Sequence, residues 1–186
     1  FTIENIDVNQ TEHISKDDVM MGMGVLPRTN LMKISAQDIR KRLEQNPWIK
    51  NVQVIKRYPS SLLIRISERK PMALVVGKDT WGIDEQGFLL PGMPTNATSQ
   101  LPLITVSEKI NPDDVDRIKN ESMKQAIYIL ERIHKDKPEM LQQISEINIT
   151  HPNNILLYTQ PDGTEVRLGN ENLDERLNKF FQIWKV

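Results

Sequence analysis

The sequence of 186 residues has no cysteine, and this absence excludes several kinds of chemistry. Without a thiol the chain can form no disulfide, cannot bind zinc through cysteine and has no cysteine nucleophile. The compartment stays open, because an oxidising environment permits disulfides but does not require them.

An excess of charge of one sign is lacking as well. The chain has 24 Lys+Arg against 25 Asp+Glu, a formal net charge of -1. Recognition of nucleic-acid phosphates needs a strong basic surplus. The composition therefore predicts no nucleic-acid partner.

A long hydrophobic run is also missing. No stretch approaches the roughly 20 apolar residues that span a bilayer, and no signal peptide is present. The chain begins with Phe1 rather than Met, opens into a strand-like segment and ends on an apolar run at 179–186. We interpret it as a piece of a longer protein, so a membrane segment is expected outside this sequence if the protein has one.

The first 70 residues contain the pattern of a small α+β module. Alternating apolar residues predict strands at 1–8, 52–54 and 62–66. Ser15 and Ser35 each precede an Asp by three positions, which is the spacing of a helix capping box with Asp in place of Glu. The order β-α-α-β-β predicts a three-stranded sheet with two helices on one face, because the first strand needs a crossover to join the hairpin.

A second, unlike part begins at Lys70-Pro71, because proline imposes an extended joint. We therefore predict two domains, 1–70 and 71–186. The second is expected to be a mixed α/β domain with a mainly antiparallel sheet and two helices. Helices are expected from 111–113 to about 134 and from about 173 onward, a loop at 91–100, and strands at 73–76, 80–83, 88–90, 103–105, 144–149, 155–159 and 164–168.

Patterns typical of catalysis or metal binding are not found in the sequence. The three histidines have no histidine or carboxylate neighbour at ligand spacing. The acidic pairs Asp84-Glu85 and Asp113-Asp114 stand at a turn and at a helix start, where carboxylates are favoured for structural reasons. We therefore expect no enzymatic activity, no metal and no cofactor, and a protein that acts through its surface.

Strands at the edges of the sheets are the surface features expected to bind partners, because their unpaired N–H and C=O groups can accept a further strand. In the first module the hairpin strand 52–58 is the candidate edge. Lys56 and Arg57 on this strand either prevent aggregation of the edge or steer an acidic partner, and both interpretations stay open. The candidate contact residues are Asn51, Val54, Lys56 and Arg57.

A series of short motifs resembles one protein family, the bacterial cell-division family FtsQ/DivIB. Each motif is weak alone, whereas the series, in the same order across nearly the whole chain, is specific. The motifs are Pro47-Trp48, Arg57-Tyr58-Pro59, Leu62–Ile66, Glu68-Arg69-Lys70-Pro71, Asp84-Glu85-Gln86-Gly87, Leu101–Ile104 and Val166–Gly169.

Some of these motif residues also have a physical interpretation of their own. Trp48 is expected to pack over the thin core of the small sheet. Glu68 is expected either to form an interdomain ion pair or to be a strand-end charge of little energetic weight. The full set expected to have structural roles is Pro47, Trp48, Pro59, Glu68, Pro71, Asp84, Gly87 and Gly169.

The resemblance implies a POTRA module at 1–70 and the family's β domain at 71–186. It implies a soluble, extracytoplasmic region that is anchored in the cytoplasmic membrane by a helix before Phe1, periplasmic in diderm bacteria. The implied function is a noncatalytic scaffold of the divisome that binds FtsB, FtsL and other division proteins and links early to late assembly during septum formation.

Two rival functions are less consistent with the sequence. A POTRA-containing protein of outer-membrane assembly or secretion would bind unfolded strands, but such proteins usually repeat the module or precede a series of barrel strands. A hydrolase acting on the cell wall would need a nucleophile, a metal cluster or a carboxylate dyad, and the sequence supplies no such set.

The chain departs from the family at its C-terminal end. The family's β domain normally continues beyond the last helix and adds strands that form the partner-binding edge, whereas this sequence stops at Val186. We therefore expect the domain to be truncated, and no family contact residue can be carried over. The expected exposed edge is the strand that contains Thr164, Val166, Arg167 and Leu168.

Overall fold

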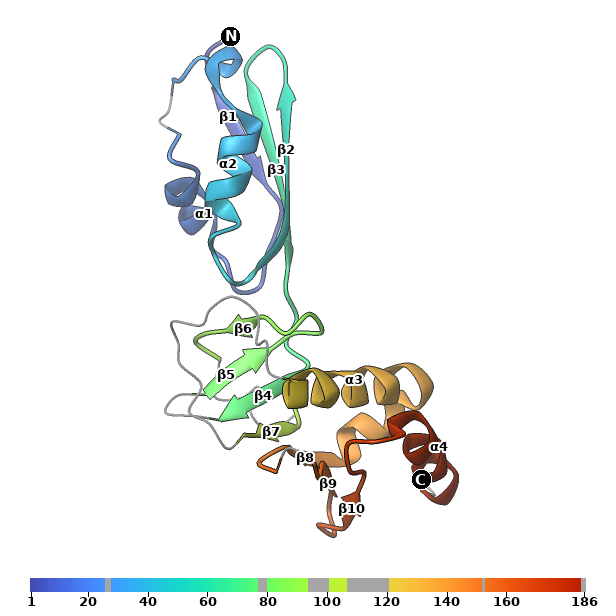
Figure 1. The fold of residues 1–186 in the computed structure, drawn as a ribbon. Helices are drawn as coiled ribbons and strands as arrows, with labels where there is room; N and C mark the ends of the chain where they lie inside the picture. The colour runs from blue at the N-terminus through green and yellow to red at the C-terminus, as the bar shows by residue number, and fades with distance from the viewer. Residues whose placement is uncertain (26–27, 77–79, 94–100, 107–120, 152, 185–186) are drawn as a thin grey trace. The chain divides into compact units, whose positions relative to one another are not determined.

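The computed structural model describes residues 1–25, 28–76, 80–93, 101–106, 121–151 and 153–184. It divides into two compact units, Phe1–Arg69 and Lys70–Val186 (Figure 1). Each unit is described by itself. The expected loop at 91–100 and the expected helix start at 111–113 lie largely or wholly outside the described residues.

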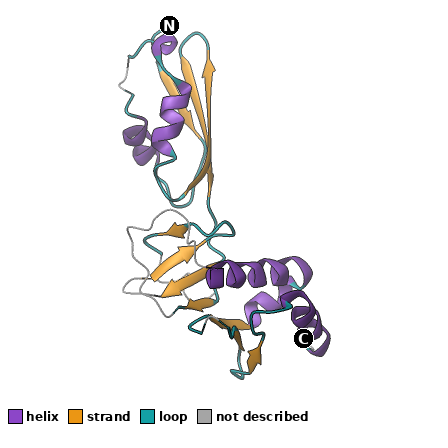
Figure 2. Ribbon diagram, in the orientation of Figure 1, coloured by secondary structure: helices purple, strands orange, loops and turns teal. Residues whose placement is uncertain are grey.

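The first unit is a three-stranded sheet with its helices on one face (Figures 1 and 2). The strand order is β1-β3-β2, with β1 parallel to β3 and β2 antiparallel to it. This confirms the predicted β-α-α-β-β module. The elements are β1 (Asn5–Val8), α1 (Lys16–Met23), a short 3-10 helix η1 (Leu31–Lys33), α2 (Ala36–Leu43), β2 (Ile49–Arg57) and β3 (Ser61–Glu68).

Capping residues fix the start of both helices, as the sequence predicts. The Ser15 hydroxyl accepts a bond from the Asp18 N–H at 3.1 Å, while the Asp18 carboxylate accepts one from the Ser15 N–H at 3.1 Å. The Ser35 hydroxyl accepts from the Asp38 N–H at 3.2 Å. Gly24, at φ +61°, ends α1 in the left-handed conformation that glycine adopts at little cost.

The second unit is built on a seven-stranded sheet of order β10-β9-β8-β7-β4-β5-β6. Two central pairings, β4 with β7 and β7 with β8, are parallel, and the other four are antiparallel. The expected mixed, mainly antiparallel sheet is therefore present. Its strands are β4 (Ala73–Val76), β5 (Thr80–Ile83), β6 (Leu89–Leu90), β7 (Leu103–Thr105), β8 (Ile144–Asn148), β9 (Leu156–Thr159) and β10 (Glu165–Arg167).

Two helices supply the apolar layer against this sheet (Figure 2). They are α3 (Glu121–Asp136) and α4 (Leu173–Ile183), and a six-residue 3-10 helix η3 (Pro138–Gln143) follows α3. Sequence periodicity missed η3, because six residues are too few to show a helical period. One core contains buried residues of both helices and of the strands, among them Leu130, Ile147 and Leu177.

Glu68 binds the loop that precedes α1, which neither interpretation of the sequence predicted. Its carboxylate accepts backbone N–H bonds from Glu12, His13 and Ile14 at 2.8, 2.9 and 3.0 Å. Partial burial alone would raise the pKa of Glu68, but these three donors and the nearby His13 ring outweigh it and hold the pKa below its ordinary value. Glu68 thus holds the loop before α1 against the end of β3, and we call this set of hydrogen bonds the clasp.

Trp48 lies beside this clasp. Its side chain is only 8% exposed, and its ring stacks on the His13 imidazole with the ring centroids 4.0 Å apart. Asn46 supports the turn before it, because its Oδ1 accepts a bond from the Trp48 N–H at 3.0 Å. The large ring therefore covers one end of the small core, as a thin module requires.

Asp84 organises a turn in the second unit. Its carboxylate is fully buried and accepts N–H bonds from Gln86 and Phe88, each at 2.9 Å. Gly87 adopts φ +82°, which closes the turn without the strain that a side chain would cause. The acidic residue is thus a turn-forming group that directs β5 into β6.

Candidate partner-binding edges

The strand β10 forms one end of the seven-stranded sheet. In the described part of the chain it pairs with β9 alone. Thr164 and Leu168 bond to β9 through the Thr164 carbonyl and the Leu168 N–H, at 3.1 and 2.9 Å. Because antiparallel strands alternate, Val166 also faces β9, and the N–H and C=O groups of Glu165 and Arg167 point to the open side. This is the geometry that can accept another strand.

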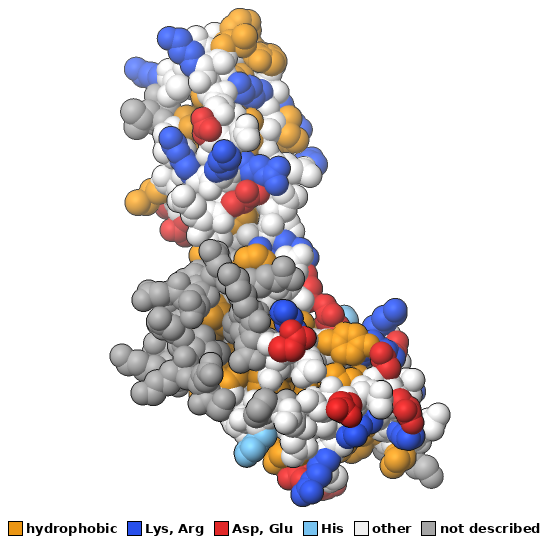
Figure 3. All heavy atoms as spheres, viewed as in Figure 1, with side chains coloured by type: hydrophobic (Ala, Val, Ile, Leu, Met, Phe, Trp, Pro, Cys, Tyr) orange, Lys and Arg blue, Asp and Glu red, His pale blue; other side chains and the backbone are white. Residues whose placement is uncertain are grey.

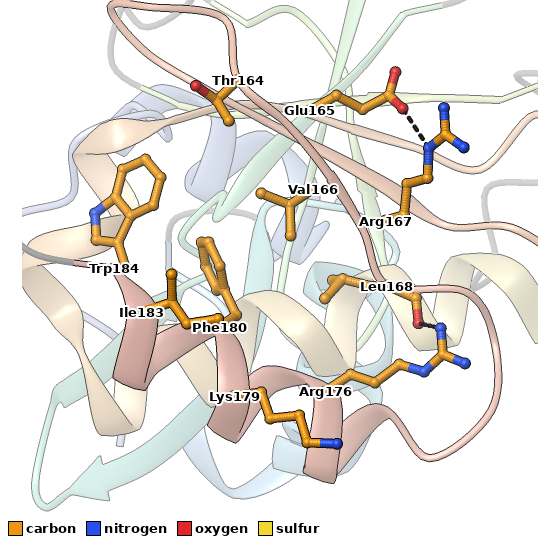
Figure 4. Close-up of a pocket in the computed structure, with 10 residues that line it drawn as sticks. All are labelled: Thr164, Glu165, Val166, Arg167, Leu168, Arg176, Lys179, Phe180, Ile183 and Trp184. Atoms are coloured by element: carbon orange, nitrogen blue, oxygen red, sulfur yellow. Dashed lines mark hydrogen bonds and ion pairs between the residues drawn. The ribbon is translucent and has the colours of Figure 1, made fainter.

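An open groove of about 510 Å³ runs between β10 and α4 (Figure 4). Val166 points into it, toward Phe180 and Leu168, whereas Glu165 and Arg167 turn away from these apolar side chains. The lining is mainly apolar at its floor and basic along the α4 side. The residues that line it are Thr164, Glu165, Val166, Arg167, Leu168, Arg176, Lys179, Phe180, Ile183 and Trp184.

The apolar side chains of the groove differ in exposure. Leu168 and Phe180 are buried, at 1% and 6%, and so form a fixed floor. Ile183 is 79% exposed, although it lies at the end of a helix whose other face is packed. An exposed large apolar side chain beside an open strand edge is a feature that a bound partner would cover.

Charged groups at β10 are paired on the face away from the groove floor. The Glu165 carboxylate accepts bonds from Arg167 Nε at 2.7 Å and from the Tyr158 hydroxyl at 3.1 Å. These two donors, with Arg167 the stronger, hold the pKa of Glu165 below its ordinary value. The pair is highly exposed at Arg167, so it orients side chains more than it stabilises the fold.

The position of α4 relative to α3 is fixed by a cluster around Arg132. Arg132 bonds to Asp136 at 2.8 Å and also to Asp174 and Tyr128. The Tyr128 hydroxyl and then the Asp136 carboxylate raise the pKa of the Arg132 guanidinium above its ordinary value. Asp174 lies in the first turn of α4, so this cluster holds the helix that forms one wall of the groove.

Two further hydrogen bonds hold α4, one from Arg176 near its start and one from Trp184 at its C-terminal end. Arg176 Nη1 donates to the Leu168 carbonyl at 2.9 Å, and Trp184 Nε1 donates to Gln143 Oε1 at 2.8 Å. Gly169 has φ +63°, and a Cβ there would lie 2.6 Å from Arg176 Nη1. The glycine is therefore needed for the backbone conformation, and a Cβ there would require the Arg176 guanidinium to shift.

The strand β2 is the corresponding edge of the first unit. On β3 the carbonyls of Ile64 and Ile66 bond to Asn9, at 3.3 and 2.9 Å, and so face β1. Backbone groups alternate in direction along a strand, so those of the even-numbered residues of β3 point toward β1 and not toward β2. The β2 residues paired with them therefore turn their own N–H and C=O groups away from β3. The open backbone groups of β2 therefore belong to Val54 and Lys56, with Val52 before them.

The eight residues predicted to contact partners differ in the direction of their backbone groups and of their side chains. At β2, Val54 and Lys56 offer backbone groups to the open edge, whereas Asn51 and Arg57 bond to β3 and present exposed side chains. At β10 only Arg167 of the four candidates offers its backbone outward. The other three, Thr164, Val166 and Leu168, face β9 with their backbone and line the groove with their side chains.

Several residues of the β10 site were missed by the sequence reasoning. Glu165 offers outward backbone groups, but only the strand register reveals this. Phe180, Ile183 and Trp184 line the groove from α4. The apolar spacing of this helix predicts one core-facing stripe, and nothing in the sequence marks Ile183 as exposed.

One cluster in the described residues has the composition of a metal site. Glu12, His13 and Glu68 can bring one ligand atom each within 4.8 Å of the others. Their proximity arises from the fold, since His13 and Glu68 are far apart in sequence. The Glu68 oxygens already accept three backbone bonds, so the clasp explains the cluster without a metal.

Among the described helices, none combines the length and the hydrophobicity needed to cross a bilayer. The comparisons with known proteins cover the whole chain. Residues 1–69 match the family model of the FtsQ-type POTRA domain, and residues 73–186 match that of the C-terminal region of cell division protein FtsQ/DivIB.

Individual relatives carry the same names. Cell division protein FtsQ of Geobacter sp. strain M21 is 28% identical over 185 residues, which are 98% of this chain and 67% of the relative. FtsQ of Syntrophotalea carbinolica is 24% identical over 184 residues, 99% of this chain and 65% of the relative. Cell division protein DivIB of Clostridium tetani is 22% identical over 191 residues, 98% of this chain and 69% of the relative.

The chain thus spans about two thirds of the length of these relatives. The two matched regions correspond to the two units of the fold, apart from residues 70–72, and the second match alone covers more than half of the sequence. The chain therefore belongs to the FtsQ/DivIB family of bacterial cell-division proteins.

Proposed function

We propose that this chain is the extracytoplasmic part of a noncatalytic divisome scaffold, comprising a POTRA domain at 1–70 and a β domain at 71–186. In this proposal the parent protein is anchored in the cytoplasmic membrane by a helix before Phe1. It binds FtsB and FtsL and links early to late division proteins. The observation that supports the proposal best is the open edge of β10 beside an apolar groove.

The geometry at β10 favours an extended partner segment. The outward N–H and C=O groups of Glu165 and Arg167 would form the hydrogen-bond ladder, which gives such complexes their register. Alternate side chains of the added strand would then lie over Val166 and Ile183. Because the net contribution of each hydrogen bond is small, burial of this apolar surface would supply most of the affinity.

The charges of the groove add a requirement on the partner sequence. Arg176 and Lys179 line the α4 side. A partner strand with apolar residues at every second position and an acidic residue toward α4 would match both the floor and this wall. A partner with lysine or arginine at that position would be disfavoured.

The β2 edge is proposed as a second, weaker contact surface, for other division proteins. Its outward backbone groups belong to Val54 and Lys56, and the exposed side chains of Asn51 and Arg57 lie on the same strand. None of these four residues lines either of the two described cavities, and only Ile49, at the start of β2, borders one of them. Ile55 is the large apolar side chain exposed on this strand, at 39%, so an added strand would gain hydrogen bonds and only limited apolar burial there.

A binding experiment with purified extracytoplasmic segments of FtsB and FtsL tests the main proposal. This chain is compared with a version extended past Val186 by the parent's own sequence, using biolayer interferometry. We expect the extended version to bind and the 186-residue chain to bind more weakly, because the resemblance implies that strands beyond Val186 enlarge the partner-binding surface. Equal, tight binding by both would contradict the role given to an added strand, and binding by neither would contradict the choice of partners.

A further inference from the structure

The end of the first unit at which the N-terminus lies has an unusual surface (Figures 1 and 3). Of the seven large apolar side chains that are strongly exposed in the described residues, three are Phe1, Met32 and Tyr58, at 65%, 59% and 58%. The exposed cations Arg28, Lys33 and Arg57 belong to the same segments. We call these six residues the N-terminal tip.

Hydrogen bonds and ring contacts bring the three segments of the tip together. The Leu31 N–H donates to the Phe1 carbonyl at 2.7 Å, and the Ile3 N–H donates to the Thr29 carbonyl at 3.0 Å. The rings of Phe1 and Tyr58 meet edge to face, with centroids 5.7 Å apart. The tip is thus one surface, although its residues are spread over 58 positions of the chain.

The tip is basic as well as apolar. Acidic groups at this end are Glu4, which accepts a bond from the Ser60 hydroxyl at 3.0 Å, and Asp38 in the first turn of α2. Three exposed cations and the half-buried Lys56 outnumber them. The whole first unit also has an excess of positive charge. Residues 1–69 carry 11 Lys+Arg against 8 Asp+Glu, whereas residues 70–186 carry 13 Lys+Arg against 17 Asp+Glu.

We propose that the N-terminal tip rests on the surface of an anionic lipid bilayer. Tyrosine and phenylalanine rings favour the boundary between lipid headgroups and acyl chains, and methionine adds flexible apolar surface. Arginine and lysine can keep their charge at the phosphates while their apolar stems lie against the membrane. This combination of side chains is typical of peripheral membrane contacts.

A bilayer fits the tip better than a folded protein or a peptide does. The tip residues line neither of the two described cavities, which lie between β10 and α4 and between α1 and α2. Anionic lipid headgroups complement the local excess of positive charge. The tip lies at the start of β3, and the joint to the second unit follows the other end of that strand. Contact at the tip would use Arg57, at the end of β2, and leave Asn51 and Val54 of that strand accessible.

The inference adds to the proposed function, in which the parent protein is anchored to a membrane, and it does not depend on the partner surface at β10. The contact is expected to be weak, with each cation contributing about fivefold to partitioning onto an anionic membrane. Loss of three cations should therefore lower partitioning by roughly 100-fold, and their reversal to Glu should lower it further.

Vesicle binding measures this contact directly. The chain is sedimented at low salt with vesicles of phosphatidylglycerol and phosphatidylcholine in equal amounts, and with phosphatidylcholine alone. We expect binding to the anionic vesicles only. The triple variant Arg28→Glu/Lys33→Glu/Arg57→Glu should lose it, whereas the matched variant Lys16→Glu/Lys41→Glu/Arg65→Glu, with the same change of charge on other exposed positions of the unit, should lose much less. Equal loss in both variants would overturn the proposal.

A second measurement locates the contact and works when free binding is too weak to sediment. Because the chain has no cysteine, a single environment-sensitive dye can be attached at Met32→Cys or, as control, at Met21→Cys, where the native side chain is 81% exposed. The labelled chains are tethered through an N-terminal histidine tag to vesicles that contain nitroxide lipids. Quenching at position 32 but not at position 21, reversed by the triple variant, is expected. Equal quenching, or none at position 32, would overturn the proposal.

Circular dichroism confirms that each variant is folded. Arg167→Pro, which is aimed at the β10 edge, should leave vesicle binding unchanged, so failure of this proposal and failure of the proposed function give different results. If the tip variants lost binding to a division protein while the native chain never touched vesicles, the tip would be a protein-binding surface and the bilayer proposal would be wrong.

Discussion

The two candidate partner-binding edges, β2 and β10, both have open backbone groups but differ in length, charge and surroundings. β2 has nine residues and is paired along its length with β3, whereas β10 has three residues and follows a tight turn. β2 carries Lys56 and Arg57, and only its first residue, Ile49, lines a described cavity, together with residues of α1 and α2. β10 lies beside a groove with an apolar floor.

This difference indicates what makes an edge suitable for a partner. Backbone groups are offered by both strands, and the net stabilisation from such hydrogen bonds is modest. What β10 adds is apolar surface on α4, which an added strand can cover. We infer that the helix beside the edge, rather than the length of the edge, decides where a tight partner binds.

The largest effect is expected from removing one outward backbone donor. In Arg167→Pro the open edge loses an N–H, and the proline ring occupies the space of an incoming carbonyl, while the bonds to β9 remain. We expect the affinity of the 186-residue chain for the FtsB and FtsL segments to fall at least tenfold, equivalent to about 1.4 kcal/mol or more. Isothermal titration calorimetry gives the value.

The matched change at the other edge is Lys56→Pro, which likewise removes an outward donor. It should alter affinity for the FtsB and FtsL segments by less than about twofold, since these segments are proposed to bind at β10 and not at β2. An equal loss in both variants would break the distinction between the edges.

A smaller effect, on stability rather than binding, is expected at Glu68. Replacing it in Glu68→Gln weakens three charge-assisted bonds, and we expect the free energy of unfolding of the first unit to fall by about 1–2 kcal/mol. Denaturant unfolding of the isolated first unit, or of the whole chain with a probe in that unit, measures this. Binding at β10 should not change.

The effect of Glu68 depends on pH with a defined sign. Its folded-state pKa lies below the ordinary value of 4.5, so the ionised form stabilises the folded unit. The difference between the native chain and Glu68→Gln should be fully present above about pH 5 and shrink as the pH falls through the folded-state pKa. A difference that grows on acidification would contradict the clasp.

Ile183 tests the contribution of the groove. Ile183→Ser removes an exposed apolar side chain, so stability should stay within about 0.5 kcal/mol. Affinity for the partner segments should fall by about fivefold, because roughly 1 kcal/mol of apolar burial is lost from the interface. Met21→Ser, at a side chain of similar exposure in the first unit, serves as the control and should leave affinity unchanged.

The smallest effect concerns the two charges of β2. If Lys56 and Arg57 protect this edge, Lys56→Leu/Arg57→Leu should self-associate in a concentration-dependent manner while remaining folded. Sedimentation velocity over a range of concentrations detects this. A variant that stays monomeric but loses an acidic partner would favour steering instead.

Local structure was predictable from the sequence to the extent that short-range rules govern it. Residues 73–76 and 80–83 were predicted as strands and form β4 and β5, and the caps at Ser15 and Ser35 form as expected. These features depend on neighbours within a few positions, which a single sequence displays directly.

Features that depend on distant segments were not predictable in this way. The donors to Glu68 lie more than 50 positions away, so its role as a clasp had no local signature. The outward backbone groups of Glu165 follow only from the register with β9. The groove requires α4 to fold back beside β10, which the Arg132 cluster secures through contacts across some 42 positions.

Amide hydrogen exchange of β10, measured by NMR, tests the central claim most directly. In the monomeric 186-residue chain we expect the amides of Glu165 and Arg167 to exchange rapidly and those of Val166 and Leu168 slowly, and we expect the two fast amides to slow when the partner segments bind. Slow exchange along the whole strand in the monomer, or partner binding that leaves Glu165 and Arg167 unprotected, would contradict the assignment of β10 as the partner-binding edge.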